Sequence, residues 1–285
     1  PLLLTTFALL WVPSSSMNPV VIQPRGRHTA TVIMLHGLGD SGHGWSSMSD
    51  ELNLPWVKFI FPSASPRPVT INGGAMCPAW ADIKGLSADA PEDEEGTLKT
   101  RAYVHSLIAS EISLGIPAAR ILIGGFSQGA AMACIAALTY ECTIGGCFVL
   151  SGWLPLKDKI QTLITEGGKK VPFFMGHGAQ DPVVPFAFGQ LSSQFMRMLG
   201  VTVDFRQYPM AHSSSPQEMT DLKRWAELRL PESGGAAAAP AAALSAEAIE
   251  AMSVKQLKDL LSSHKVDISD CVEKGDLLRK ARALL

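Results

Sequence analysis

The chain has 285 residues, of which 47% are hydrophobic and 18% charged, and its formal net charge is −2. This composition is typical of a folded globular protein and excludes a largely disordered chain. The near-neutral charge and an aromatic content of only 7% argue against a protein that coats nucleic acid or an acidic membrane surface. Five cysteines without a C-x-x-C pair predict free thiols in a reducing compartment, and neither a disulfide framework nor a zinc site.

The first residues, 1–16, are an apolar leader of uncertain status. Within them, residues 2–12 are almost wholly apolar but shorter than the roughly 20 residues that span a bilayer. They fit the core of a signal peptide whose basic start is missing, which would indicate a secreted protein, or translated upstream sequence with Met17 as the initiator. We favour the second interpretation and predict a main domain over residues 17–230.

Short apolar runs alternate with helical patterns along this domain. We expect strands at residues 31–35, 57–61, 121–124, 147–150, 172–175 and 201–208. We expect helices at residues 97–114, 128–138, 185–199 and 216–228. Strands that are apolar throughout are covered on both faces, so this pattern predicts an α/β fold with a mostly parallel sheet flanked by helices. Ligands of such sheets bind beyond the carboxyl ends of the strands.

A second, smaller unit is expected at the C-terminus. Residues 231–243 are rich in Gly, Ala and Pro, which predicts a linker. Residues 244–285 regain an amphipathic periodicity, and this indicates a small all-α module of two helices.

The strongest motif is Gly-Phe-Ser-Gln-Gly at residues 125–129, between an expected strand and an expected helix. Such a sharp turn needs small neighbours and lifts the hydroxyl of Ser127 above the sheet. The helix N-terminus behind Ser127 offers N–H groups and a positive dipole end to a developing oxyanion. Ser127 is therefore the candidate nucleophile.

A serine nucleophile needs a base, and the base needs an acid that orients it. His212 follows the last expected strand, and Asp181 follows the strand before it. The order Ser127, Asp181, His212 is that of α/β-hydrolases. Asp204 is a weaker candidate for the acid because it lies inside an expected strand, and we expect His177 to be structural.

Glycines also follow the first central strand, in the segment His-Gly-Leu-Gly-Asp at residues 36–40. The N–H of Leu38 can join the N–H of Gln128 as an oxyanion hole. The alternative is an ordinary glycine-rich turn. We favour the oxyanion hole because the serine motif needs such a partner, and we expect His36 itself to be structural.

Residues 62–96 carry few secondary-structure signals, and long segments of this kind are often functional. Their apolar members either line an acyl-binding channel or pack as local core, and the sequence leaves both interpretations open. These members are Met76, Trp80, Ile83 and Leu86. We expect the acidic stretch at residues 91–95 to be solvated.

Together these motifs resemble the acyl-protein thioesterase/lysophospholipase group of the phospholipase–carboxylesterase family. The resemblance covers residues 20–230 and depends on the ordered blocks HGLGDSGHGW, FPSASPRPVTINGG, PAWADIKGLS, GGFSQG, SGWLPL, DPVVP and HSSSPQEM. One departure is Ala130, where the family pattern has a second glycine. A methyl group there is expected to alter the packing behind the nucleophile without removing a catalytic group.

The resemblance implies an α/β-hydrolase that uses no metal or other cofactor. It assigns roles to seven residues: the triad Ser127, Asp181 and His212, the oxyanion-hole residues Leu38 and Gln128, and the substrate-binding residues Trp80 and Leu86 in the loop that shapes the acyl site.

The activity implied by the resemblance is hydrolysis of the acyl thioesters of S-palmitoylated proteins through an acyl-enzyme at Ser127. The alternative within the same chemistry is a general carboxylesterase or lysophospholipase. An alternative of another class is a non-catalytic scaffold that acts through the C-terminal module, although the intact triad argues against it. The expected partners are S-acylated proteins or lysophospholipids as substrates. We expect a cytoplasmic protein without a transmembrane span.

The C-terminal unit resembles an SAP-like helical module through residues 252–261 and 273–277. Modules of this type bind DNA. From residue 246 onward, however, seven Lys and Arg residues meet seven Asp and Glu residues. Because zero net charge weakens binding to phosphates, we expect a protein partner or a packing role and no binding of nucleic acid.

Overall fold

The computed structural model describes residues 18–87, 89–232, 254, 257–258, 261, 266 and 273–282. The chain divides into two compact units, Pro1–Glu232 and Ser233–Leu285. The expected apolar leader and most of the expected linker lie outside the described residues. Among the described residues, no helix is long and apolar enough to cross a membrane.

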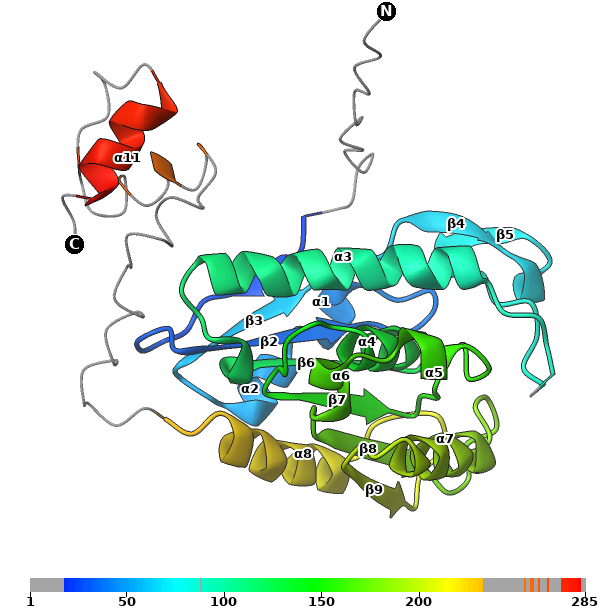
Figure 1. Cartoon of the computed structure of the whole chain (residues 1–285). Helices are drawn as coiled ribbons and strands as arrows, with labels where there is room; N and C mark the ends of the chain where they lie inside the picture. The colour runs from blue at the N-terminus through cyan, green and yellow to red at the C-terminus, as the bar shows by residue number, and fades with distance from the viewer. Residues whose placement is uncertain are drawn as a thin grey trace, which may run out of the picture. The chain divides into compact units, whose positions relative to one another are not determined.

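A seven-stranded sheet forms the centre of the larger unit (Figure 1). Its strands are, in spatial order, β1 (Val20–Ile22), β3 (Val57–Phe61), β2 (Ala30–Leu35), β6 (Ile121–Phe126), β7 (Gly146–Leu150), β8 (Phe173–Gly178) and β9 (Val203–Tyr208). Only β1 among them is antiparallel to its neighbour. The mostly parallel sheet predicted from the sequence is therefore confirmed.

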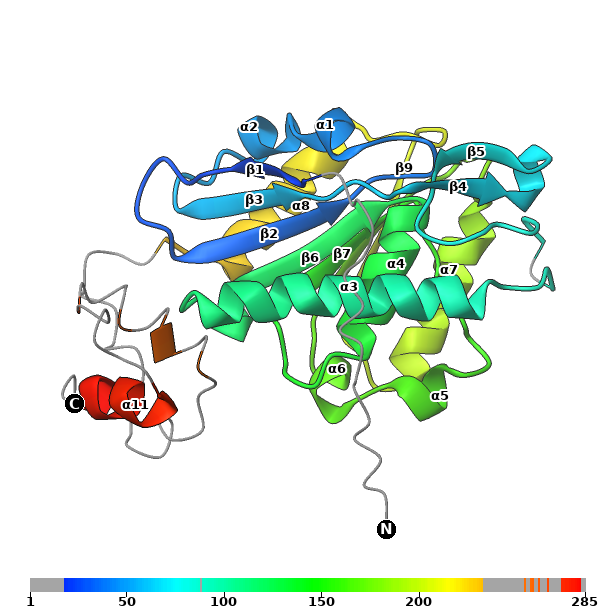
Figure 2. The ribbon, with the colours of Figure 1, turned by 90° about the horizontal axis from the view of Figure 1, so that it is seen from above.

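Helices cover both faces of this sheet, as Figure 2 shows. One face carries α3 (Glu94–Ser113), α4 (Gln128–Leu138) and α7 (Phe186–Met198), with the short helices α5 (Ile160–Leu163) and α6 (Glu166–Lys169) beside them. The other face carries α1 (Gly42–Trp45), α2 (Met48–Leu52) and α8 (Pro216–Arg229). The central strands are buried throughout because both of their faces are covered, which is why their sequences lack alternation.

One apolar core lies on each face of the sheet, and different helices cover the two cores. All residues of α4 are buried and most are small, so this helix lies close against the sheet. On the opposite face, Met48 and Leu52 of α2 pack in one cluster with Leu222 and Trp225 of α8. The cores fix the strand ends relative to one another, and these ends carry the candidate site residues.

Two strands that the sequence did not indicate lie in the segment that was expected to lack regular structure. They are β4 (Pro66–Val69) and β5 (Ala75–Pro78), and they form an antiparallel pair joined by a short 3-10 helix, Thr70–Asn72. Pro66 and Pro68 supply no N–H to a ladder, so the segment PRPV carries a weak strand signal. A second 3-10 helix, Ala118–Arg120, precedes β6.

In the smaller unit, the structure describes the helix α11 (Lys274–Arg282). Leu277 and Ala281 of α11 are buried, as are Leu257 and Leu261. These residues belong to the apolar faces expected from the periodicity. The rest of the expected helical pair lies outside the described residues, as does Cys271.

Candidate active site

Ser127 lies in a sharp turn between β6 and α4. Its backbone has φ 54° and ψ −120°, a conformation that is strained for a residue with a side chain. The turn is held by the N–H of Ser127, which donates to the carbonyl of Leu150 at 2.9 Å. A Cβ on Gly125 would lie 2.4 Å from the backbone of Gly129, so only glycines allow strand and helix to approach this closely.

The structure brings the three residues of the expected triad together. The Nε2 atom of His212 lies 2.9 Å from Oγ of Ser127, and its Nδ1 atom lies 2.7 Å from Oδ2 of Asp181. A carboxylate only accepts hydrogen bonds, so we assign the proton to Nδ1 and leave Nε2 free to accept from the serine hydroxyl. These side chains follow the carboxyl ends of β6, β8 and β9, and β7 lies between β6 and β8 in the sheet.

The loop after β8 holds the carboxylate of Asp181 in place. Its Oδ1 atom accepts the N–H groups of Val183 and Val184 at 2.9 and 2.8 Å, which leaves Oδ2 for His212. His177 is buried, and its Nε2 lies 2.9 Å from the carbonyl of Val184. Burial lowers the pKa of His177, so this ring is neutral and donates to that carbonyl. The expected structural role of His177 agrees with this position.

Asp204, the weaker candidate for the acid, lies elsewhere. It is part of β9, and its carboxylate pairs with Arg206 at 2.8 Å. This pair lies at the edge strand of the sheet and partly in solvent, so Asp204 takes no part in the hydrogen bonds that join Ser127 to Asp181.

Two backbone N–H groups lie on either side of the serine. Gln128 is the first residue of α4, and Leu38 lies in the turn after β2. A Cβ on Gly37 would lie 3.5 Å from Cβ of Ser127, so this turn packs directly against Ser127. In the described part of the chain, neither the N–H of Leu38 nor that of Gln128 has a hydrogen-bond partner. Both are therefore available to an oxyanion.

His36 supports this turn from below. It is buried, its Nε2 accepts the N–H of Ala64 at 2.9 Å, and its Nδ1 lies 2.7 Å from the carbonyl of Gly37. Because Nε2 accepts, Nδ1 carries the proton and donates to Gly37. Burial lowers the pKa of His36, which keeps the ring neutral, and the structural role expected for it agrees with these contacts.

The side chain of Gln128 connects the nucleophile turn to the loop after β5. Its Oε1 accepts the N–H of Trp80 at 3.0 Å, and its Nε2 donates to the carbonyl of Ala81 at 2.7 Å. Trp80 is buried, and its indole N–H donates to the carbonyl of His36. Trp80 thus packs beneath the site as local core, one of the two alternatives left open by the sequence.

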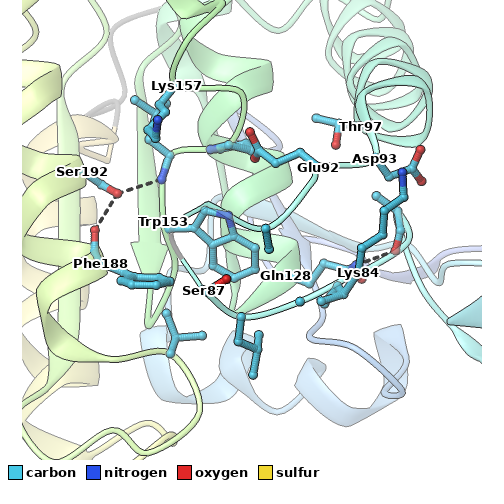
Figure 3. Close-up of a pocket in the computed structure, with 18 of the residues that line it drawn as sticks. Lys84, Ser87, Glu92, Asp93, Thr97, Gln128, Trp153, Lys157, Phe188 and Ser192 are labelled. Atoms are coloured by element: carbon cyan, nitrogen blue, oxygen red, sulfur yellow. Dashed lines mark hydrogen bonds between the residues drawn. The ribbon is translucent and has the colours of Figure 1, made fainter. Parts of the chain in front are cut away.

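A cavity of about 400 Å³ begins beside Gln128 and runs between the loop after β5 and helix α7 (Figure 3). Its walls are mainly apolar and include Ile83, Leu86, Trp153, Val184, Phe188 and Phe195. Ile83 and Leu86 therefore take the channel position that the sequence offered as the other alternative. Trp80 does not line this cavity, and Met76 lies exposed on β5.

The acidic stretch at residues 91–95 lies at the surface, as expected, with Pro91, Glu92 and Glu95 exposed, but two of its carboxylates have structural partners. Both carboxylate oxygens of Glu92 accept the N–H of Leu156 at 2.9 Å, and burial raises the pKa of this carboxyl group. Asp93 caps α3 by accepting the N–H of Gly96, and it pairs with Arg67. Glu92 and Asp93 also line the cavity (Figure 3), so the stretch anchors one wall.

Sequence reasoning missed the wall formed by the loop after β7 and by α7. Trp153 comes from that loop, and Phe188 and Phe195 come from the helix. The available signal was the position of Trp153 two residues after Ser151, just beyond the carboxyl end of a predicted strand, where ligands of parallel sheets bind.

Ala130, the departure from the family pattern, is buried. A Cβ on Gly152 would lie 2.6 Å from its methyl group, so this methyl fills the space behind Ser127.

A model of the family described as Phospholipase/Carboxylesterase matches residues 16–229. The protein named acyl-protein thioesterase 1 from Cryptococcus neoformans is 44% identical over 74% of this chain and 97% of its own length. The protein of the same name from Neurospora crassa is 42% identical over 75% of this chain and 92% of its own length. The family model lies within the larger unit.

Solved structures show the same fold. Acyl-protein thioesterase 2 from Zea mays is 34% identical, with a TM-score of 0.69 over 75% of this chain and 99% of its own. SOBER1 from Arabidopsis thaliana is 35% identical, with a TM-score of 0.68 over 70% of this chain and 99% of its own.

Residues 243–285 match a different model, described as an E3 ubiquitin-protein ligase rififylin-like domain. This similarity concerns the C-terminal unit alone. The family match over most of the chain, the relatives above 40% identity and the parallel sheet agree with one another. The chain therefore belongs to the phospholipase/carboxylesterase family and is a hydrolase with the α/β-hydrolase fold.

Proposed function

We propose that the protein is a serine hydrolase that cleaves the thioesters of S-acylated proteins, with palmitoyl groups as the main acyl chains. One observation carries this proposal: the hydrogen bonds from Asp181 through His212 to Ser127 end beside an apolar cavity of about 400 Å³. The relatives named acyl-protein thioesterase 1 support the same substrate class.

In the first half-reaction, Oγ of Ser127 attacks the thioester carbonyl carbon while its proton passes to Nε2 of His212. Asp181 stabilises the imidazolium that forms. The tetrahedral intermediate then collapses, the bond from carbon to sulfur breaks, and His212 returns the proton to the departing cysteine thiolate. The products are the free protein thiol and an acyl ester on Ser127.

In the second half-reaction, His212 takes a proton from a water molecule, and the oxygen of this water adds to the acyl carbonyl. Collapse of the second intermediate breaks the ester bond, and His212 gives the proton to Oγ of Ser127. The free fatty acid leaves and the starting state returns. In both steps the negative oxygen accepts the N–H groups of Leu38 and Gln128, and donors of this kind contribute about 3–4 kcal/mol each to transition-state stabilisation.

The acyl chain enters the cavity beside Ser127 in this proposal. Cavities of a few hundred Å³ with apolar walls suit small apolar ligands. Leu86 contacts the chain from the loop after β5, whereas Trp80 shapes the site by holding that loop to His36 and Gln128. The rim is apolar too, since Leu191 and Met198 of α7 are 59% and 76% exposed.

A lysophospholipase or general carboxylesterase is the second candidate. The family description itself favours it, and the same triad would cleave an oxygen ester with an alcohol as the leaving group. A substrate comparison separates the two candidates, because the acyl half is shared and only the leaving group differs.

The decisive experiment compares the wild-type chain with Ser127→Ala on a palmitoyl-thioester peptide and on a lysophospholipid, with fluorophosphonate labelling of both proteins. We expect labelling and thioester turnover in the wild type and neither in the variant. Labelling with faster turnover of the lysolipid would favour the second candidate. A folded wild type without labelling or turnover would overturn the hydrolase proposal and leave the scaffold alternative.

The two-part organisation also remains our proposal. The catalytic domain spans residues 17–230, residues 231–243 link it to the module at residues 244–285, and this module binds a protein partner. We place the protein in the cytoplasm, which is supported by four unpaired thiols among the described residues. Burial raises the pKa of two of them, Cys134 and Cys147, so these thiols are packing groups without nucleophilic character.

A further inference from the structure

Phe126, the residue before Ser127, contacts two further parts of the site. Its ring centre lies 4.8 Å from that of the His212 imidazole, with a tilt of 46°. A Cβ on Gly37 would lie 3.2 Å from Cδ1 of Phe126, so the backbone before Leu38 packs against the ring. The ring therefore contacts both the base and the turn that carries one oxyanion donor.

A second aromatic ring supports the first. Trp45, the last residue of α1, has its ring centre 5.1 Å from that of Phe126, with a tilt of 32°. Both side chains are partly buried and pack against the core on the face of α2 and α8. The rings of Trp45, Phe126 and His212 thus form a continuous series that begins at the edge of the core and ends at His212.

We propose that Phe126 is a positioning residue for catalysis, which holds the imidazole of His212 and the turn at Gly37 against Ser127 and stabilises the imidazolium that forms during the reaction. This inference rests on the proposed serine hydrolase function. Ring centres 4.8 Å apart lie within the range of favourable aromatic pairs. A cation within about 6 Å of an aromatic ring is attracted by its π electrons, so the contact strengthens when His212 takes the proton of Ser127.

The sign of one pH effect separates this role from simple packing. If the ring stabilises the imidazolium, its removal favours the neutral base, and the acid limb of the kcat/KM profile moves to lower pH. If the ring only excludes water, its removal admits water, which favours the charged form. The acid limb then moves to higher pH. A purely structural side chain leaves the limb unchanged.

The test uses the full chain and a p-nitrophenyl butyrate assay across pH 5–9, with the rate of fluorophosphonate inactivation as a second readout. For Phe126→Leu we expect kcat to fall at least fivefold with KM within twofold. We also expect slower inactivation and an acid limb at lower pH. Phe126→Tyr keeps the ring, so we expect its kcat to stay within twofold of wild type and its acid limb to stay at the wild-type pH.

Phe205→Leu is the matched control, because it removes a partly buried ring that contacts Phe186 at 5.6 Å and lies outside the described triad contacts. We expect it to change the melting temperature as much as Phe126→Leu and to leave the acid limb in place. The inference is overturned if Phe126→Leu keeps wild-type kcat, or if its acid limb stays or moves to higher pH. A wild type that neither reacts with the fluorophosphonate nor hydrolyses the ester contradicts the proposed function instead.

Trp45 offers an independent check through a double-mutant cycle. If Trp45 acts through Phe126, Trp45→Leu lowers kcat in the wild-type background and has no further effect in the Phe126→Leu background. Equal effects in both backgrounds would mean that the two rings act separately, and this would contradict the continuous series of rings.

Discussion

At the scale of single residues, the two oxygens of Asp181 have separate tasks. Oδ1 accepts two backbone N–H groups from Val183 and Val184, and Oδ2 faces Nδ1 of His212. In Asp181→Asn the amide oxygen is expected to keep the place of Oδ1, because only an acceptor satisfies these N–H groups. The amide NH₂ then faces His212 and donates to Nδ1.

This substitution therefore forces the proton of His212 onto Nε2, where it can no longer accept from Ser127. We expect kcat to fall by about 10⁴ with little change in stability, as the same exchange does in the serine protease triad. Ester hydrolysis and thermal denaturation measure the two effects. Asp204→Asn is the control, with activity within twofold of wild type because Asp204 pairs with Arg206 at the sheet edge. A loss of activity of similar size in Asp204→Asn would contradict the assignment of the acid role to Asp181.

A second residue-scale prediction concerns Glu218 of α8. It is fully buried, and neither carboxyl oxygen has a hydrogen-bond partner among the described residues. A Cβ on Gly176 would lie 2.1 Å from its Oε1, so the carboxyl lies directly against β8. Burial raises the pKa of Glu218 to about 8 from its ordinary 4.5.

Between pH 4.5 and 8 the folded protein keeps a proton on Glu218 that the unfolded chain releases. Stability therefore falls as pH rises through this window, by about 1.4 kcal/mol per unit of pKa difference. Glu218→Gln has no such loss, so its stability relative to wild type is expected to increase by several kcal/mol between pH 4.5 and 8.5. Urea denaturation at both pH values measures it. A constant difference between the two proteins would contradict the prediction.

The order of Ser127, Asp181 and His212 along the chain, together with the strand ends before them, was enough to predict which side chains meet. The place of Trp80 was not predictable in this way. Its burial depends on Gln128 and on the carbonyl of His36, which are 48 and 44 residues away in sequence. The sequence of a long loop does not show whether an apolar side chain packs into the core or lines a cavity.

At the scale of elements, the close approach of α4 to the end of β2 fixes the position of Ser127 relative to the turn after β2. A Cβ on Gly129 would lie 2.3 Å from the carbonyl oxygen of Leu35 and 2.4 Å from that of His36. Gly129→Ala must therefore move α4 or the end of β2, and both movements displace Ser127 from the turn that carries Leu38.

We expect Gly129→Ala to lower the free energy of unfolding by about 1–3 kcal/mol, as overpacking does in cores, and to lower ester hydrolysis at least tenfold. Urea denaturation and the ester assay measure the two effects. Gly26→Ala is the control in the same unit, because the nearest atom to its added Cβ is 3.5 Å away. A Gly129→Ala protein with wild-type stability and activity would show that the helix has room to adjust.

The long buried elements were predictable and the short ones were not. The strands β2, β3, β7 and β8 and the helix α4 lie within a few residues of their expected bounds, because continuous burial leaves a strong apolar signal. The three-residue strand β1 and the four-residue helix α1 are too short to show a period. The pair β4 and β5 stands apart from the main sheet and contains three prolines, so its formation depends on contacts that local sequence does not report.

At the scale of the whole molecule, the larger unit and the C-terminal unit match different families. The Cryptococcus protein matches 74% of this chain over 97% of its own length, so a protein of this family is complete without the segment that resembles a rififylin-like domain. The boundary follows from the packing. Leu230 is fully buried, and its carbonyl accepts the indole N–H of Trp56 at 2.8 Å.

A pair of truncations tests this boundary. A chain that ends at Glu232 keeps Leu230, and we expect it to hydrolyse p-nitrophenyl butyrate within twofold of the full chain and to unfold at the same urea concentration. A chain that ends at Arg229 loses a buried leucine and the acceptor of Trp56, which together cost about 3–5 kcal/mol. If the longer truncation also loses activity, the C-terminal unit contributes to catalysis. If both truncated chains keep their activity and stability, the packing of Leu230 does not contribute to the stability of the domain. The expected contrast would show that the C-terminal unit is separable from the hydrolysis of small esters.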